Sequence, residues 1–135
     1  DAFYLADDSG MEIDHLDGRP GVRSARYAGE DCDDEANNDK VLKEMAGVPD
    51  AERSCRFRCA LSLVGEGLDE SFSGACEGTL LHRRRGTGGF GYDPLFQPCE
   101  SPRTFAEISA EEKAEISHRA RALALLMNFL GAKLG

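Results

Sequence analysis

Apolar and polar side chains alternate through residues 56–64, near the middle of the chain. The apolar positions are Phe57, Cys59, Leu61 and Leu63. A period of two is typical of a strand with one buried face, because successive side chains leave a strand on opposite sides. A second stretch of this kind, residues 71–80, follows the turn-forming sequence Gly65-Glu66-Gly67. The sequence therefore predicts an antiparallel hairpin, and any fold of this chain has to be built around it.

Helical patterns lie on both sides of the hairpin. Residues 33–46 carry an apolar stripe, with Asp33 or Asp34 as a candidate cap and Gly47 as a terminator, and this pattern predicts a surface helix. The last third of the chain begins with two capping-box patterns, 104–107 and 109–112. The helically spaced apolar residues that follow are Ile116, Ala120, Leu123, Met127 and Leu130. We therefore expect the C-terminal part to be helical.

A short apolar run precedes Asp7-Asp8-Ser9-Gly10 near the start of the chain. Because Asp, Ser and Gly favour turns, we expect a strand that ends at Ala6 and a turn that holds both aspartates. Met11 and Ile13 would then begin a second short strand. The chain starts without Met and enters the apolar residues 2–6 at once, so we also expect that further sequence precedes it.

A length of 135 residues predicts one domain over 1–135. The net charge of −9 argues against a partner that is a nucleic-acid polymer, since binding its phosphates requires many basic residues. The longest apolar stretch, residues 122–127, is far shorter than the roughly 20 residues of a membrane span, and no signal-peptide pattern is present. Five cysteines without a dense framework indicate reduced thiols, and we expect a soluble cytoplasmic protein.

Residues 83–94 form the densest candidate site. Three arginines precede four glycines within six positions, and unshielded amides in such a positively charged segment suit a phosphate group. The pattern is neither a Walker A loop nor a dinucleotide-binding fingerprint. Phe90 and Tyr92 can stack on a nucleobase, and Asp93 can accept from a ring N–H. A flexible loop with an aromatic plug is the alternative, and the local sequence leaves both open.

Asp7 and Asp8 form a second candidate site. Mg²⁺ prefers hard oxygen ligands and usually binds through one or two carboxylates together with substrate phosphates. A carboxylate that is not fully committed to the ion can serve as general base toward an attacking water. The alternative is a solvated turn held by a local hydrogen bond from an aspartate side chain.

Lys113, His118 and Arg119 form the third. On one uninterrupted helix Lys113 and His118 would lie about 140° apart, at about 100° per residue, so they could not easily face one ligand. A break at Ile116-Ser117 would solve this, with Ser117 as the cap of a new helix. Cations in its first turn oppose the helix dipole and favour an anionic or carbonyl-bearing ligand. Alternatively, Lys113 is solvated and His118 is a surface residue with a protein partner.

Together these segments resemble the inosine/xanthosine triphosphate pyrophosphatases, which remove non-standard nucleotides. The matching segments, in the family's order, are Ala6-Asp7-Asp8-Ser9-Gly10, Gly18–Val22 with Ser24–Tyr27, Thr87–Pro94, and Ile116-Ser117-His118-Arg119. The resemblance extends over essentially all 135 residues. It implies an α/β fold, with an elongated mixed β-sheet, flanking helices, a substrate cleft between lobes and a homodimeric assembly.

The resemblance also implies an activity and a set of site residues. The activity is Mg²⁺-dependent hydrolysis of ITP, dITP or XTP to the monophosphate and pyrophosphate, by attack of water on the α-phosphorus. Asp8 would be the proton acceptor and a metal ligand, and Asp7 its neighbour in the metal shell. The substrate-binding positions would be Ser9, Phe90, Gly91, Tyr92, Asp93, Lys113, His118 and Arg119.

One departure from the family keeps two alternatives open. Family members begin with a strand, a loop that holds the triphosphate and a helix, all before the Asp-Asp-Ser-Gly motif, so the chain resembles their C-terminal two-thirds. A non-catalytic nucleotide-binding remnant and a related pyrophosphatase acting on dTTP or UTP are therefore the alternatives. The enzymatic interpretation requires Asp7 and Asp8 to face the glycine-rich segment across one crevice.

Overall fold

The computed structural model describes residues 4–65 and 67–134. Its strands are β1 (Tyr4–Ile13), β2 (Arg19–Pro20), β3 (Ser54–Gly65), β4 (Leu68–Leu80) and β5 (Phe96–Pro98). Its α-helices are α1 (Asp34–Glu44), α2 (Ala110–Ile116) and α3 (His118–Leu134). Short 3₁₀ helices are η1 (Asp14–Leu16), η2 (Gly21–Arg26), η3 (Asp50–Glu52) and η4 (Asp93–Leu95). The strands form one sheet in the order β2-β1-β3-β4-β5.

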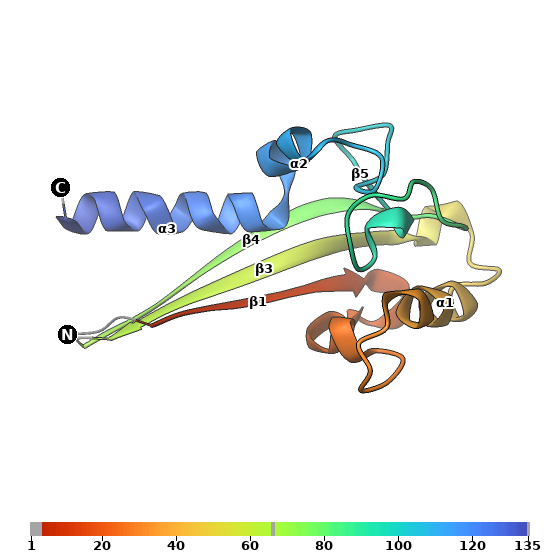
Figure 1. Ribbon diagram of the computed structural model, residues 1–135, viewed down its shortest axis with the longest axis horizontal. Helices are drawn as coiled ribbons and strands as arrows, with labels where there is room; N and C mark the ends of the chain where they lie inside the picture. Colours follow the sequence, from red (N-terminus) through yellow and green to blue (C-terminus); the bar gives the residue numbers. More distant parts are fainter. Residues whose placement is uncertain (1–3, 66, 135) are drawn as a thin grey trace.

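The predicted hairpin is confirmed and forms the long axis of the molecule (Figure 1). β3 and β4 pair antiparallel from Ser54↔Thr79 to Gly65↔Leu68, and Glu66 of the expected turn lies outside the described residues. The α/β class, with an elongated sheet and flanking helices, is confirmed as well. Every strand pair of the described sheet is antiparallel, so the parallel component of the expected mixed sheet is not found within it.

The expected turn at Asp7-Asp8-Ser9-Gly10 is wrong, because these residues lie inside the continuous strand β1. Ten residues of β1 pair with β3, from Tyr4↔Val64 to Ile13↔Cys55. This long register outweighs the local turn preference of Asp, Ser and Gly, since strand propensity depends strongly on the neighbouring strands. As a consequence, neighbouring side chains of the motif leave the sheet on opposite faces.

α3 covers one face of the hairpin, beside β4 (Figure 1). Ala122 and Leu126 of α3 form a core cluster with Cys59, Leu61 and Leu63 of β3. A Cβ atom on Gly74 of β4 would collide with the backbone nitrogen of Ala122 and the carbonyl oxygen of His118. Gly74 therefore permits a backbone-to-backbone approach that fixes the first turn of α3 on the sheet.

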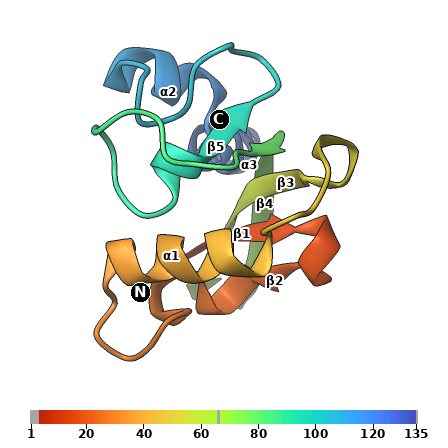
Figure 2. The ribbon, with the colours of Figure 1, turned by 90° about the vertical axis from the view of Figure 1, so that its right-hand side faces the viewer.

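The larger core lies at the opposite end of the sheet. Met11 and Ile13 of β1 pack there with Val41 and Met45 of α1, and with aromatic residues of β3, β5 and the following loop. These aromatic residues are Phe57, Phe96 and Phe105. Seen along the long axis, α1 and η2 lie on one side, and α2 and the segment around β5 lie on the other (Figure 2).

Most of the predicted helix boundaries are confirmed. The Asp33 side chain caps α1, and Ser109 with Glu112 forms a complete capping box at α2. Ser117 separates α2 from α3, and its hydroxyl accepts from the Ala120 N–H at 3.1 Å. The box at 104–107 is only half formed, because the Thr104 hydroxyl donates to the Arg85 carbonyl instead.

Two further sequence expectations concern the cysteines and the membrane. All five cysteines are free thiols, and Cys55, Cys59 and Cys76 are buried. No helix in the described part of the chain has the length and apolar character needed to cross a lipid bilayer.

Candidate functional site

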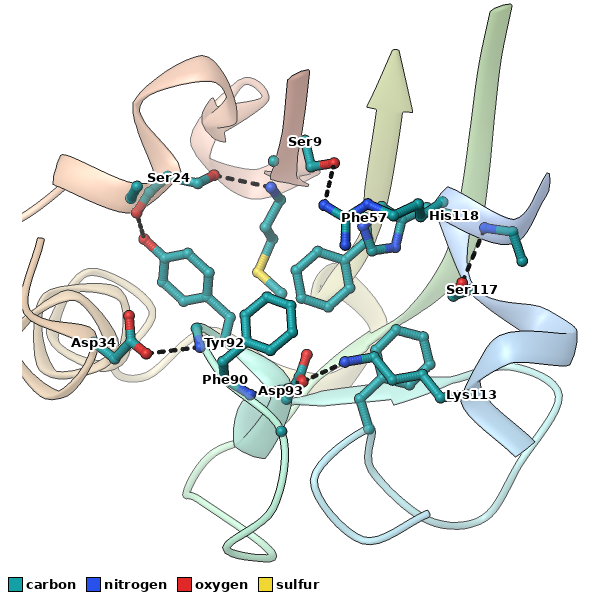
Figure 3. Close-up of a pocket in the computed structure, with 18 of the residues that line it drawn as sticks. Ser9, Ser24, Asp34, Phe57, Phe90, Tyr92, Asp93, Lys113, Ser117 and His118 are labelled. Carbon is teal, nitrogen blue, oxygen red and sulfur yellow. Dashed lines mark hydrogen bonds and ion pairs between the residues drawn. The ribbon is translucent and has the colours of Figure 1, made fainter. Parts of the chain in front are cut away.

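A cavity of about 730 Å³ opens where α1 and η2 face α2 and the start of α3 (Figure 3). Its lining contains all eight residues that the sequence predicts as substrate contacts: Ser9, Phe90, Gly91, Tyr92, Asp93, Lys113, His118 and Arg119. The walls are mostly apolar, with a few convergent polar groups, which is typical of a small-molecule site. Neither Asp7 nor Asp8 belongs to this lining.

The glycine-rich segment forms one wall of the cavity. Gly89 and Gly91 have φ of +70° and +57°, a conformation that disfavours residues with a Cβ. The Asp93 carboxylate accepts from the Phe90 N–H at 3.0 Å and from Lys113 Nζ at 2.6 Å. The Lys113 ammonium also lies 4.6 Å from the centre of the Phe90 ring. The structure therefore uses Asp93 to hold the loop and Lys113, while acceptance from a nucleobase remains a prediction for this residue.

Residues that the sequence motifs do not single out hold this wall from the other side. The Tyr92 hydroxyl donates to the Ser24 carbonyl at 2.6 Å, and burial raises the pKa of Tyr92, so it remains a protonated donor. The Gly91 N–H donates to Asp34 at 2.9 Å, and the Asn38 amide donates to the Gly91 carbonyl at 3.0 Å. Ser24 lies in one of the segments that carry the family resemblance, and this position could have indicated from the sequence that it lies near the site.

Two of the three arginines before the loop contribute less free positive charge than expected. Arg84 pairs with Asp39 at 2.9 Å, and Arg85 pairs with Glu107 at 3.0 Å. Each of these charges is thus partly neutralised by a nearby carboxylate. Their sequence position next to the glycines overstated the positive potential of the loop.

His118 lies at the start of α3 and is only 8% exposed. Its ring stacks on Phe57, with 5.0 Å between the centroids, and no described residue bonds its buried Nδ1 atom. Burial, followed by the charges of Arg119 and Lys113, lowers the pKa of His118 to about 4. His118 is therefore a neutral ring at pH 7, able to donate or accept one hydrogen bond toward a ligand.

This buried neutral histidine predicts a loss of stability in mild acid. The unfolded chain takes up a proton near pH 6.5, whereas the folded protein does so only near pH 4, so stability falls as the pH drops between these values. Relative to His118→Gln, the wild type should lose up to about 3 kcal/mol between pH 7 and pH 4. Urea unfolding at several pH values measures this difference. Parallel stability curves for the two proteins would contradict it.

Arg119, Asp7 and Ser9 form a closed set of hydrogen bonds at the rim of the cavity. Arg119 Nε donates to Asp7 Oδ2 at 3.0 Å, and Arg119 Nη2 donates to Ser9 Oγ at 3.2 Å. The Ser9 hydroxyl donates to Asp7 Oδ1 at 3.1 Å. Desolvation would raise the pKa of Asp7, but the bonds from Ser9 and Arg119 and the charge of Arg119 outweigh it and lower the pKa.

Asp8 lies on the other face of β1, where it lines a smaller groove of about 150 Å³ with Gly21, Val22 and Arg58. Ser9 and Gly10 line both this groove and the large cavity. β2 pairs only with Glu12 and Ile13 of β1, so within the described sheet no strand covers the β1 edge at Ser9 and Gly10. Ser9 and Gly10 thus lie between the two hollows, and η2 packs against the β1 backbone there, since a Cβ on Gly10 would meet the Gly21 carbonyl oxygen. The glycine-rich segment and Asp8 therefore line two neighbouring hollows and not the single crevice that the sequence predicted.

The side chains near the Asp-Asp-Ser-Gly motif determine whether the expected Mg²⁺ can bind there. Across residues 4–65 and 67–134, no group of three or more His, Cys, Asp or Glu side chains is arranged to hold a metal ion. Asp7 and Asp8 leave opposite faces, and Asp7 is already paired with Arg119, so the two carboxylates do not form a shared metal shell. The groove contains two carboxylates, and Glu12 is paired with Arg58 at 3.2 Å. Asp8 is therefore the carboxylate that fits an ion whose shell is completed by phosphates and water.

Comparisons with known proteins agree with the motif pattern. A family model described as the Ham1 family matches residues 1–129. The dITP/XTP pyrophosphatase of Geobacter sulfurreducens is 55% identical over 128 residues, which cover 94% of this chain and 64% of that protein. The dITP/XTP pyrophosphatase of Desulforamulus reducens is 51% identical over 127 residues, with 93% and 63% covered. The chain thus spans less than two thirds of these relatives.

Solved structures give the same result for the fold. The Staphylococcus aureus Ham1 protein superposes with a TM-score of 0.93 at 40% identity, covering 97% of this chain and 68% of that one. The nucleoside-triphosphatase, or dITP/XTP pyrophosphatase, of Mycobacterium abscessus superposes with a TM-score of 0.83 at 43% identity, covering 95% and 66%. The chain therefore shares its fold with these solved structures.

Proposed function

Because this chain belongs to the Ham1 family, we propose that the protein is a pyrophosphatase for non-standard purine nucleoside triphosphates. It would hydrolyse dITP, XTP or ITP to the monophosphate and pyrophosphate and so cleanse the nucleotide pool. The observation that carries the proposal is the large cavity, which gathers the aromatic loop, Lys113, His118 and Arg119 beside the Asp-Asp-Ser-Gly motif. Relatives with 50–55% identity are named dITP/XTP pyrophosphatases, which supports this substrate class.

The cavity suits a 6-keto purine. Phe90 and Tyr92 offer aromatic surface to the base, and Lys113 and Arg119 offer N–H donors to a carbonyl oxygen. Adenine presents an amino group at position 6, which is itself a donor, so these cations would be left without an acceptor. A site built on hydrogen bonds strongly rejects a ligand that leaves its polar groups unpaired.

The β1 edge offers a route for the phosphates. With the base in the large cavity, the phosphate chain would pass Ser9 and Gly10, which line both hollows, and reach the groove that contains Asp8. Asp8 would accept the proton of the water that attacks the α-phosphorus, with pyrophosphate as the leaving group. Asp8 would also hold Mg²⁺, and a bound ion would neutralise phosphate charge.

We also propose that the protein is cytoplasmic and forms a homodimer, as the family resemblance predicts. Five free thiols, three of them buried, suit a reducing compartment. Tyr4, Leu5 and Met127 expose apolar surface that a second subunit could cover. Light scattering of the purified protein measures its assembly.

A substrate panel tests the proposed activity. Pyrophosphate release is measured with dITP, XTP, ITP, ATP, dTTP and UTP, with and without Mg²⁺. The proposal predicts that keto-purine triphosphates exceed ATP in kcat/KM by at least about a hundredfold. A site that forms hydrogen bonds with its substrate discriminates to this extent or more against a nucleotide that lacks the matching acceptor. Preference for dTTP or UTP would favour the related pyrimidine enzyme, and no release from any nucleotide would favour a non-catalytic remnant.

The two residues at the start of α3 should carry part of this selectivity. Replacing His118 or Arg119 by alanine is expected to reduce the ITP-to-ATP ratio of kcat/KM by about tenfold, because each loss removes one polar group that distinguishes the two bases. The measurement is kcat/KM for both nucleotides in each variant. Equal losses on ITP and ATP would instead assign these side chains to the phosphates.

A further inference from the structure

We infer that Asp7 is a positioning residue that holds the Arg119 guanidinium at the rim of the cavity, rather than a ligand of the metal. The inference rests on the proposed function where it concerns substrates. It is carried by the Asp7–Ser9–Arg119 hydrogen bonds and by the opposite directions in which Asp7 and Asp8 leave β1.

Both oxygens of the Asp7 carboxylate are occupied by protein donors. Oδ2 accepts from Arg119 Nε, and Oδ1 accepts from the Ser9 hydroxyl and, at 3.5 Å, from the Cys59 thiol. Cys59 is a buried member of the cluster beneath α3, so this contact fixes Asp7 to the α3 side of the sheet. The Asp7 carboxylate therefore lies on the opposite face of the sheet from the groove that contains Asp8.

The guanidinium is bound along one edge only. Nε reaches Asp7 and Nη2 reaches Ser9, while no residue of the described chain accepts from Nη1. The remaining N–H groups stay available to a ligand in the cavity that Arg119 lines. An arginine side chain has many rotamers, so anchoring two of its nitrogens in advance reduces the ordering cost on binding.

Asp7 also offsets the unfavourable electrostatic position of Arg119. Arg119 lies in the first turn of α3, where the helix dipole disfavours a cation. The second cation of the cavity, Lys113, has an analogous partner in Asp93. Each cation that lines the cavity is thus held by a carboxylate from another element, which fixes its position before a ligand arrives.

The first test needs no substrate. Exchange of the Arg119 Nε–H proton with water is followed by NMR in the wild type, in Asp7→Asn and, as a matched control, in Asp14→Asn, which disrupts the distant Arg56 pair. We expect exchange at Arg119 to accelerate about fivefold or more in Asp7→Asn and to stay unchanged in Asp14→Asn, in line with the loss of one exposed charge-assisted bond. Equal exchange in all three proteins would overturn the inference.

The second test separates positioning from metal binding. Asp7→Asn should raise KM for dITP about fivefold and leave the Mg²⁺ concentration for half-maximal rate unchanged, and its effect should largely disappear in an Arg119→Ala background. A raised Mg²⁺ requirement, or an effect that simply adds to that of Arg119→Ala, would overturn the inference. If the wild type releases no pyrophosphate at all, the proposed function fails, while the exchange experiment still decides the role of Asp7.

Discussion

Asp8→Asn is expected to reduce kcat for pyrophosphate release from dITP by about three orders of magnitude, within the range that a general base contributes. The substitution preserves the shape of the side chain but removes the charge that would accept a proton from water. Asp8 is exposed in an open groove, so we expect the fold to depend little on this charge. The thermal midpoint should therefore stay within about 2 °C of the wild type.

Asp69→Asn removes another exposed aspartate, from β4 at the hairpin end of the sheet, and should leave both kcat and stability unchanged. If Asp8→Asn kept a kcat near that of the wild type, another group would have to accept the proton. The proposed path of the phosphates to Asp8 would then have no support.

Gly74→Ala is expected to destabilise the protein by about 3 kcal/mol or more, because overpacking at a site that cannot relax is costly. The added Cβ would meet backbone atoms of His118 and Ala122, and backbone cannot move aside as a flexible side chain can. α3 would have to lift from the sheet at its first turn. Since His118 and Arg119 belong to this turn, activity on dITP should fall together with stability.

Gly131→Ala provides the matched control on the same helix. A Cβ at Gly131 meets nothing within 4 Å, so alanine should stabilise α3 by about 0.5–1 kcal/mol through its helix propensity. Urea unfolding and circular dichroism measure both variants. An unchanged free energy of unfolding for Gly74→Ala would show that α3 is not held by this close approach.

The features that could be predicted from the sequence are those set by local chemistry. The alternation of 56–64 and 71–80 specified the hairpin, and Ser117 specified the break that brings Lys113 and His118 to one cavity. Both depend on neighbours within a few residues, through side-chain periodicity and capping. The aromatic loop and the start of α3, selected from their motifs and the family resemblance, line the large cavity, and their contacts with a substrate stay a prediction.

The features that could not be predicted depend on distant partners. Asp7-Asp8-Ser9-Gly10 has the composition of a turn, and only its pairing with β3 makes it a strand. The separation of Asp7 from Asp8 follows directly from that strand, because side chains alternate between its faces. The pairing of Arg84 with Asp39 and of Lys113 with Asp93 likewise joins residues that the sequence does not connect.

The central claim is that the large cavity holds the purine while the phosphates reach Asp8 across Ser9 and Gly10. The most direct measurement is a crystal structure of the protein with xanthosine monophosphate. We expect the base beside Phe90 and Tyr92, its 6-oxygen within hydrogen-bond reach of Lys113 or Arg119, and the phosphate at the β1 edge next to Asp8. A base bound outside the cavity, or a phosphate on the far side from Asp8, would contradict this arrangement.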